Sequence, residues 1–376
     1  MKNLLATILA LSSLQLIAQS EVQITEVEML DSGFIEVLEV LPDSFPEVEL
    51  ILRVTDQNGE PIWNLDEAKF SVNENQSNLN VNKVYQISND KSIHVGLVLD
   101  ESGSMEVDES QLFDRYGNPL YRVNIFGNVT FPKGYVKPID AMKSASSKFL
   151  DAFDFEKDSI ALIAFSDQVN QVVVKGESLG QVKRGIRSLE ADGGTAFYTA
   201  VDRGLEEIKI GDGLKVLVAL TDGNDNRSSL GLDDVILKAQ LYEIPIYVIG
   251  LGDVNQDTLA LLARETNGEY YYSRNAFGLD DVYQRIKDRI QSVYGLTYQS
   301  QNFNPSDTSR EVLIQYMTDS SYASANHSVE LPNEVITYLE ERRNKRVIYT
   351  ALGVGVAIGL GGYLLLYRRR SKVNVA

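Results

Sequence analysis

Between Lys91 and residue 295 the sequence repeats one pattern, in which a short apolar run is followed by a segment of helical periodicity. The runs are rich in β-branched residues and predict buried strands over Ser92–Asp100, Ser159–Ser166, Leu214–Thr221 and Ile244–Leu251. Helices are predicted over Ile139–Asp151, Gln181–Leu189, Ala196–Glu207, Leu232–Leu241 and Gln256–Glu265, followed by a short strand at Glu269–Ser273 and a last helix at Leu279–Val293. This order predicts an α/β fold with a doubly wound, mainly parallel sheet that helices cover on both faces.

Polar residues follow two of these strands at the point where each strand ends. The strand that ends at Asp100 runs into Glu101-Ser102-Gly103-Ser104, and the strand that ends at Thr221 runs into Asp222-Gly223. A third polar segment, Gly193-Gly194-Thr195, lies between two predicted helices. Ligands of open parallel sheets bind beyond the carboxyl ends of the strands, so we expect these segments to meet. Their carboxylates and hydroxyls form an all-oxygen set of the kind that Mg²⁺ prefers, with Mn²⁺ or Ca²⁺ as alternatives.

The segments DESGS, GGT and TDG, in this order and at these strand ends, resemble the von Willebrand factor type A domain. The resemblance covers roughly residues 91–295 and implies a metal-ion-dependent adhesion site, in which Mg²⁺ binds the Asp or Glu carboxylate of a protein partner. The implied ligands, direct or through water, are Asp100, Ser102, Ser104, Thr195 and Asp222. Glu101, Gly194 and Asn224 adjoin these ligands and are predicted to contact the partner. The alternative is that these side chains only cap loops and helix starts.

One segment departs from the pattern of that family. About thirty residues, 106–138, separate Ser104 from the first predicted helix, where the family passes almost directly into it. The turn signal Tyr116-Gly117-Asn118-Pro119 has alternating residues on both sides, which predicts a hairpin insert. Beside the metal-binding loops, this insert would form part of the partner-binding surface or partly cover the site.

The segments on both sides of the α/β region have a β pattern. Residues 20–90 contain strand-like runs at Val48–Val54, Phe70–Val72 and Val81–Ile87, and residues 296–335 contain more at Glu311–Tyr316 and Ser328–Leu331. Each flank alone is small for a stable sandwich. We therefore predict one β-sandwich built from both flanks, into which the α/β domain is inserted, with two separate β units as the alternative. Residues 336–346 are predicted to be a charged juxtamembrane linker.

Both ends of the chain carry membrane signals. Residues 1–19 have an early Lys and a short apolar run, which predicts a secretory signal peptide. Residues 347–367 have no charge over the length of a bilayer and predict a transmembrane helix, with residues 368–376 as a basic cytoplasmic tail. The bulk of the chain is then exported, to a bacterial periplasm or cell surface. Ala351, Gly355 and Gly359 recur every fourth residue and suggest self-association in the membrane.

The composition excludes several classes of function. The chain has no Cys, two His and a formal charge of −18, which leaves no thiol nucleophile and argues against binding to nucleic acid. No general base accompanies the motifs, so we predict that the chain is not an enzyme and give a metal-dependent hydrolase the least weight. The leading hypothesis is a membrane-anchored protein that mediates Mg²⁺-dependent protein–protein binding or adhesion. The alternative is a structural component of a cell-envelope assembly that acts through its β-sandwich and transmembrane helix, with a metal site that only stabilises it.

Overall fold

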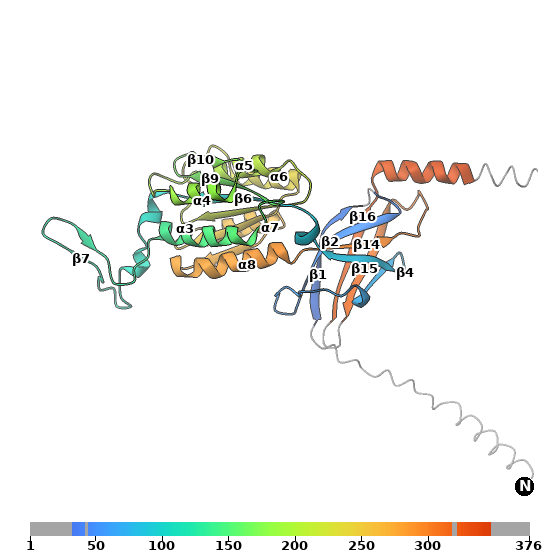
Figure 1. Ribbon diagram of the computed structural model, residues 1–376, viewed down its shortest axis with the longest axis horizontal. Helices are drawn as coiled ribbons and strands as arrows, with labels where there is room; N and C mark the ends of the chain where they lie inside the picture. The colour runs from blue at the N-terminus through green and yellow to red at the C-terminus, as the bar shows by residue number, and fades with distance from the viewer. Residues whose placement is uncertain (1–31, 42–43, 318–321, 347–376) are drawn as a thin grey trace, which may run out of the picture.

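The computed structural model describes residues 32–41, 44–317 and 322–346, which form an α/β domain and a β domain (Figure 1). The α/β domain has a six-stranded sheet in the order β10-β9-β6-β11-β12-β13. Its strands are β6 (Ile93–Asp100), β9 (Ser159–Phe165), β10 (Val169–Val173), β11 (Leu214–Thr221), β12 (Ile246–Leu251) and β13 (Tyr270–Ser273). All neighbouring strands pair in parallel except β10, which pairs antiparallel with β9 at one edge.

Helices cover both faces of this sheet, as the sequence predicts. One apolar core lies beneath α3 (Pro138–Phe149), α4 (Leu179–Arg187) and α8 (Leu279–Gln291), and contains Met142, Ile186 and Ile286 from them. The other lies beneath α5 (Phe197–Ile208), α6 (Leu232–Tyr242) and α7 (Gln256–Glu265), and contains Leu205, Val235 and Leu262. The central strands are buried along their whole length because both of their faces are covered, which explains their continuously apolar sequences. The doubly wound α/β fold is therefore confirmed.

The β domain draws its strands from both sides of the α/β domain. Its single sheet has the order β4-β3-β15-β16-β1-β2-β14-β5. The strands are β1 (Ser32–Leu41), β2 (Glu47–Thr55), β3 (Phe70–Glu74), β4 (Ser77–Leu79), β5 (Val81–Gln86), β14 (Tyr294–Gln299), β15 (Ser309–Met317) and β16 (Tyr322–Glu330). Because β14 pairs with β2 and β5, and β15 pairs with β3, the two flanks are interleaved in one unit around the inserted domain.

The β domain differs from the predicted sandwich in its hydrogen bonding. All eight strands belong to one sheet rather than to two stacked sheets. Leu79 of β4 and Val84 of β5 come from opposite edges of this sheet and still pack in the same core, so the sheet curls around its apolar face. Curling lets a single sheet bury one face without a second layer.

Residues 333–346 are helical, although the sequence predicts a linker over most of this range. Val335 and Leu339 are buried in a small cluster with Leu331 and Phe45, so this helix packs on the β domain. Within the described ranges no helix is both long and apolar enough to cross a membrane. The predicted signal peptide, the predicted span with Ala351, Gly355 and Gly359, and the predicted tail lie outside the described residues.

The insert after β6 contains short elements. Two 3₁₀ turns, Gly103–Glu106 and Glu109–Gln111, follow the motif loop, and a two-stranded hairpin of β7 (Arg122–Val123) and β8 (Val129–Thr130) comes next. The hairpin projects from the end of the α/β domain that is remote from the β domain (Figure 1). The predicted turn at Tyr116–Pro119 closes a smaller bridge between Phe113 and Pro119 rather than this hairpin.

Candidate functional site

Three loops meet at the carboxyl ends of the central strands. The loop after β6 is joined to the loop before α5 by a hydrogen bond of 3.0 Å from Gly103 N to Gly193 O. The loop before α5 is joined to the loop after β11 by a hydrogen bond of 2.9 Å from Asn226 N to Thr195 O. These backbone contacts join residues that are 90 and 31 positions apart in sequence, as expected for the edge of a parallel sheet.

Asp100, the last residue of β6, lies at the bottom of the site and is fully buried. Its Oδ1 accepts a hydrogen bond of 2.8 Å from Ser102 N, and its Oδ2 accepts one of 2.6 Å from Thr221 Oγ1. Both donors are fixed by strand ends, so the carboxylate has one orientation. Burial raises the pKa of Asp100 above its ordinary value.

Asp222 faces the two serine hydroxyls of the motif loop. Its Oδ1 accepts a hydrogen bond of 2.6 Å from Ser104 Oγ and lies 3.4 Å from Ser102 Oγ, and the two hydroxyls are 3.0 Å apart. Burial, followed by repulsion from Asp100, raises the pKa of Asp222 to about 7. Two carboxylates that repel each other in a partly buried site are stabilised by a nearby cation.

Thr195 reaches the same point from the loop before α5. A Cβ atom added to Gly223 would lie 3.1 Å from Thr195 Oγ1 and 3.8 Å from Ser104 Oγ, so both hydroxyls close around this glycine. A side chain at position 223 would crowd Thr195, which explains why a glycine follows Asp222. The structure therefore brings together all five of the predicted ligands, Asp100, Ser102, Ser104, Thr195 and Asp222.

A second layer of polar residues holds the loop that carries Thr195. Asp167 accepts a hydrogen bond of 3.0 Å from Gly194 N and forms an ion pair of 2.7 Å with Arg227. Asn226 Oδ1 accepts from Thr195 N at 3.1 Å. The sequence alone does not single out these residues, because their partners come from other loops. Its position two residues after the end of β9 is the only local signal for Asp167.

The three predicted partner-contacting residues lie in different environments. Glu101 is only 7% exposed and accepts hydrogen bonds from Asn170 Nδ2 at 2.9 Å and from Glu190 N at 3.3 Å, so its carboxylate holds neighbouring loops together. This burial argues against the predicted contact of Glu101 with a partner. Gly194 is half-buried, and any Cβ there would lie within 3 Å of Asp167, Asn226 and Arg227. Asn224 is exposed, and its Oδ1 accepts from Asn255 N at 2.9 Å.

The donor set fits a hard divalent cation. Carboxylate and hydroxyl oxygens at one point are ligands for Mg²⁺, Mn²⁺ or Ca²⁺, whereas zinc sites are built mostly from His and Cys. In the described part of the chain no group of three or more His, Cys, Asp and Glu side chains gathers at one point. The two aspartates thus supply the negative charge of this site, and the hydroxyls supply neutral oxygens.

Residues 135–285 match the family model described as the von Willebrand factor type A domain. Similar solved structures include proximal thread matrix protein 1 from the mussel byssus, with 16% identity, a TM-score of 0.41, and coverage of 57% of this chain and 49% of that chain. Another structure of the mussel protein has a zinc-occupied MIDAS motif. This chain thus spans about half the length of the mussel protein that it matches.

Two bacterial structures are also similar. A von Willebrand factor type A protein from Catenulispora acidiphila has 13% identity and a TM-score of 0.42, with coverage of 80% of this chain and 72% of that chain. The conserved hypothetical protein BatB from Bacteroides thetaiotaomicron has 15% identity and a TM-score of 0.39, with coverage of 53% of this chain and 98% of that chain. None of the curated proteins matches this chain.

Proposed function

We propose that this chain, whose α/β domain is a von Willebrand factor type A domain, is an exported and membrane-anchored protein that binds a protein partner through a divalent cation. The cation, Mg²⁺ in this proposal, is held by Asp100, Ser102, Ser104, Thr195 and Asp222, and the partner supplies an Asp or Glu carboxylate.

The observation that carries the proposal is the pairing of Asp222 with the motif loop. Its carboxylate lies 2.6 Å from Ser104 Oγ and 3.4 Å from Ser102 Oγ, and burial, followed by repulsion from Asp100, raises its pKa. A site that gathers two carboxylates with no basic side chain among the five residues needs a positive charge from elsewhere. A divalent cation supplies it and, with only two carboxylates around it, remains attractive to a further anionic oxygen.

The protein residues have separate tasks in this binding. Asp100 anchors the motif loop from below, because Ser102 N and Thr221 Oγ1 both donate to it. Ser104 is exposed, so the outer side of the site is open to a partner. Thr195 is presented by a loop that Asp167 and Asn226 hold in place.

Binding rather than catalysis is proposed because no histidine belongs to this site. His94 lies near the start of β6, at the opposite end of the strand from Asp100, and its ring nitrogens contact Ser159 Oγ and Asp212 O. His327 lies in β16 of the other domain. The carboxylate of Glu101, which follows Asp100, is held by hydrogen bonds from Asn170 and Glu190.

Export and membrane anchoring are supported by the sequence patterns at residues 1–19 and 347–367. The helix at 333–346 leads from the β domain to the second of these segments, so the metal-binding loops would lie at the end of the molecule remote from the anchor (Figure 1). This arrangement suits a protein that presents its site away from the membrane surface.

Capture of partners from envelope extracts tests the proposal. The full-length chain and its Asp222→Ala variant are immobilised and exposed to extract in Mg²⁺ or in EDTA, and the bound proteins are identified by mass spectrometry. Asp253→Ala is the matched control, because Asp253 is an exposed aspartate that follows the neighbouring strand β12.

We expect a partner that is retained in Mg²⁺ by the wild-type chain and by Asp253→Ala, and lost in EDTA or with Asp222→Ala. A partner that all variants retain in EDTA would contradict the proposal and would favour the structural role in an envelope assembly.

A further inference from the structure

The insert after β6 ends in an arm, residues 115–135, that projects beyond the α/β domain (Figure 1). Its hairpin pairs Arg122 with Thr130 and Val123 with Val129. Every residue from 122 to 130 is exposed. The core of the domain therefore does not require the side chains at the end of this arm.

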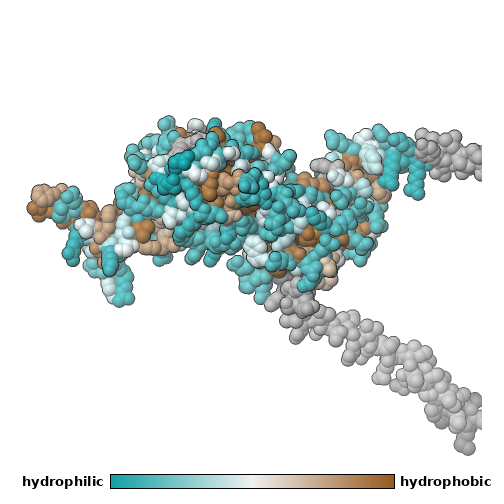
Figure 2. Space-filling model, in the orientation of Figure 1, coloured by the Kyte–Doolittle hydropathy of each residue, from teal (hydrophilic) through white to brown (hydrophobic). Residues whose placement is uncertain are grey.

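The tip of the arm is apolar. Ile125 is 93% exposed and Phe126 is 82% exposed, and Figure 2 shows this apolar end against the largely hydrophilic surface of the α/β domain. Two neighbouring large apolar side chains at a turn are unusual, because turns favour Gly, Asn, Asp, Pro and Ser.

The turn holds these side chains outward by its own hydrogen bonds. Asn124 Oδ1 accepts from Phe126 N at 2.9 Å and from Asn128 N at 3.0 Å, and Gly127 N donates to Asn124 O at 3.0 Å. Gly127 has φ +82°, which a glycine adopts without strain. Asn124 thus accepts the hydrogen bonds of the turn and Gly127 supplies its backbone conformation. The side chains of Ile125 and Phe126 are left to contact something outside the described chain.

The charge of the arm is opposite to that of the protein. Residues 115–135 contain Arg115, Arg122 and Lys133 and no Asp or Glu, whereas the whole chain has a formal charge of −18. Lys137 pairs with Glu106 at the base. Arg122 and Lys133 are exposed, and neither forms an ion pair with another described residue. Free cationic groups therefore lie behind an apolar tip.

Aromatic side chains lie between the tip and the base. Phe131 and Tyr135 stack with ring centroids 4.3 Å apart, and the Arg115 guanidinium lies 4.7 Å from the centroid of the Tyr116 ring. An apolar tip with aromatic rings, Arg and Lys behind it combines the kinds of side chain that enter the acyl, interfacial and headgroup regions of a bilayer.

We propose that this arm inserts Ile125 and Phe126 into the surface of an anionic phospholipid bilayer, with Arg122 and Lys133 at the level of the headgroups. Charge complementarity favours an anionic surface. A bilayer suits the tip because a convex pair of apolar side chains needs no shaped pocket in order to be buried. The arm and the helix at 333–346 lie at opposite ends of the molecule in Figure 1, so this surface is not the bilayer that would hold residues 347–367.

Labelling at single cysteines tests the proposal directly, because the chain has no native Cys. Ile125→Cys is labelled with the environment-sensitive fluorophore NBD in the full-length chain, reconstituted in phosphatidylcholine nanodiscs. Phosphatidylglycerol vesicles or phosphatidylcholine vesicles are then added. Leu241→Cys is the matched probe, because Leu241 of α6 is 77% exposed and lies outside the arm.

We expect the NBD emission at position 125 to shift to the blue and to brighten with phosphatidylglycerol vesicles, and to change little with phosphatidylcholine vesicles. The label at position 241 should not respond. Substituting Arg122→Gln and Lys133→Gln in the labelled chain should weaken the response to anionic vesicles, by roughly fivefold in affinity for each cation removed.

Three results would overturn the proposal. These are no change at position 125 with anionic vesicles, an equal change with phosphatidylcholine, or an equal change at position 241. A response at position 125 to an acidic protein in place of vesicles would assign the arm to a protein partner instead.

Discussion

The side-chain hydroxyl of Thr221, a residue that is not among the proposed ligands, helps to orient the carboxylate of Asp100. Thr221 Oγ1 donates to Asp100 Oδ2 at 2.6 Å, and both residues are fully buried. Thr221→Val keeps the shape of the side chain and removes the donor. We expect a loss of about 1–3 kcal/mol in the free energy of unfolding, because a buried acceptor is left without its partner. We also expect weaker Mg²⁺ binding.

Urea unfolding and metal titration measure the two effects of Thr221→Val. Thr258→Val, near the start of α7, is the control, since only its backbone N takes part in a cap. If Thr221→Val bound Mg²⁺ as tightly as the wild type, the orienting role of Thr221 would be disproved.

His94 gives the α/β domain a stability that depends on pH. Burial lowers the pKa of His94, and Lys175 and Lys215 lower it further, while Asp212 O and Asp158 oppose them. The unfolded chain therefore takes up a proton at a higher pH than the folded chain. The contribution of the neutral His94 ring to the free energy of unfolding is fully present above the ordinary pKa of about 6.5, and it is lost as the pH falls below this value.

We expect the free energy of unfolding to fall more, or rise less, between pH 7.5 and pH 5.5 in the wild type than in His94→Gln. Asp222, whose raised pKa acts in the opposite direction, is present in both proteins, so the test compares them. Urea unfolding at the two pH values checks this, with His327→Gln in the β domain as the control. The same decrease in His94→Gln and in the wild type would show that other groups cause the pH dependence.

The sequence shows which residues meet at the three loops, but it does not show where their neighbours point. Asp100, Ser102, Ser104, Thr195 and Asp222 could be named because strand ends of a parallel sheet share one edge. The burial of Glu101 could not be foreseen, because successive residues of a tight loop can face opposite directions. Asp167 and Asn226 could not be found, since each is matched to a loop distant in sequence.

At the scale of elements, two glycines let α5 approach the sheet. Gly204 of α5 lies so close to the strands that an added Cβ would be 2.7 Å from Leu217 Cδ1 and 2.9 Å from Val98 Cγ2. Gly96 of β6 faces the same leucine, at 2.4 Å. We expect Gly204→Ala to destabilise the protein by about 1–3 kcal/mol because the helix must shift outward.

Gly180 of α4 provides the matched control, because a Cβ there meets no atom closer than 3.5 Å. Gly180→Ala should be neutral or stabilising by up to about 1 kcal/mol, because alanine favours the helix. Urea unfolding of both variants measures the difference. Equal effects of the two substitutions would contradict tight packing of α5.

Elements were predictable where both of their faces are buried. The runs that form β6, β9, β11 and β12 are continuously apolar, so their sequences identify them. The edge strand β10 (VNQVV) was not identified, because it is short and contains polar residues. The helix at 333–346 was predicted to be mostly linker because its sequence is rich in charged and polar residues. Only two of its residues, Val335 and Leu339, are buried.

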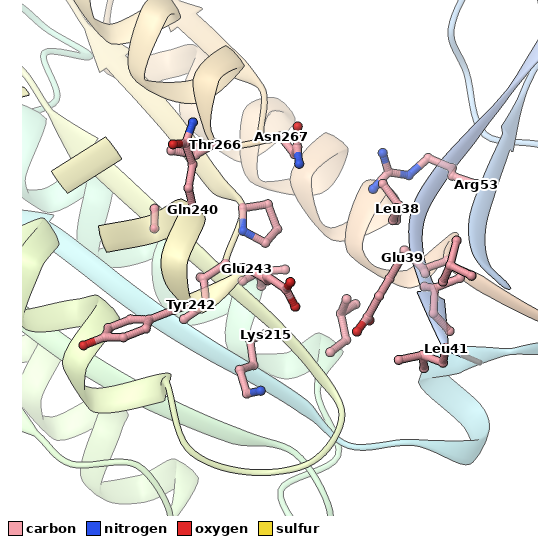
Figure 3. A pocket seen from close by; sticks show the side chains of 18 of the residues that line it. Leu38, Glu39, Leu41, Arg53, Lys215, Gln240, Tyr242, Glu243, Thr266 and Asn267 are labelled. Carbon is pink, nitrogen blue, oxygen red and sulfur yellow. The ribbon is translucent and has the colours of Figure 1, made fainter. Parts of the chain in front are cut away.

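At the scale of the whole molecule, the two domains are joined by Arg53 of β2. Its guanidinium donates to Tyr247 Oη at 3.0 Å and to Arg289 O at 3.2 Å in the α/β domain, and pairs with Glu36 of β1 at 2.8 Å. A cleft of about 670 Å³ lies beside this contact (Figure 3), where Arg53 and Glu39 on one side face Lys215 and Glu243 on the other.

Removal of Arg53 should loosen the contact between the domains. We expect Arg53→Ala to lower the free energy of unfolding by about 1–3 kcal/mol, because the buried Tyr247 hydroxyl loses its partner. Urea unfolding and small-angle X-ray scattering measure the stability and the domain arrangement. Arg203→Ala is the control, since Arg203 is exposed and its ion pair is with Glu207 of the same helix, α5. An Arg53→Ala protein with wild-type stability and scattering would show that other contacts hold the domains.

The binding of Mg²⁺ to the three loops is the central claim, and isothermal titration calorimetry of the full-length chain tests it most directly. We predict saturable binding of one Mg²⁺ by the wild type and by Asp253→Ala, and no binding by Asp222→Ala, with the three circular dichroism spectra superimposable. Binding retained by Asp222→Ala, or absent from a folded wild-type chain, would contradict the account.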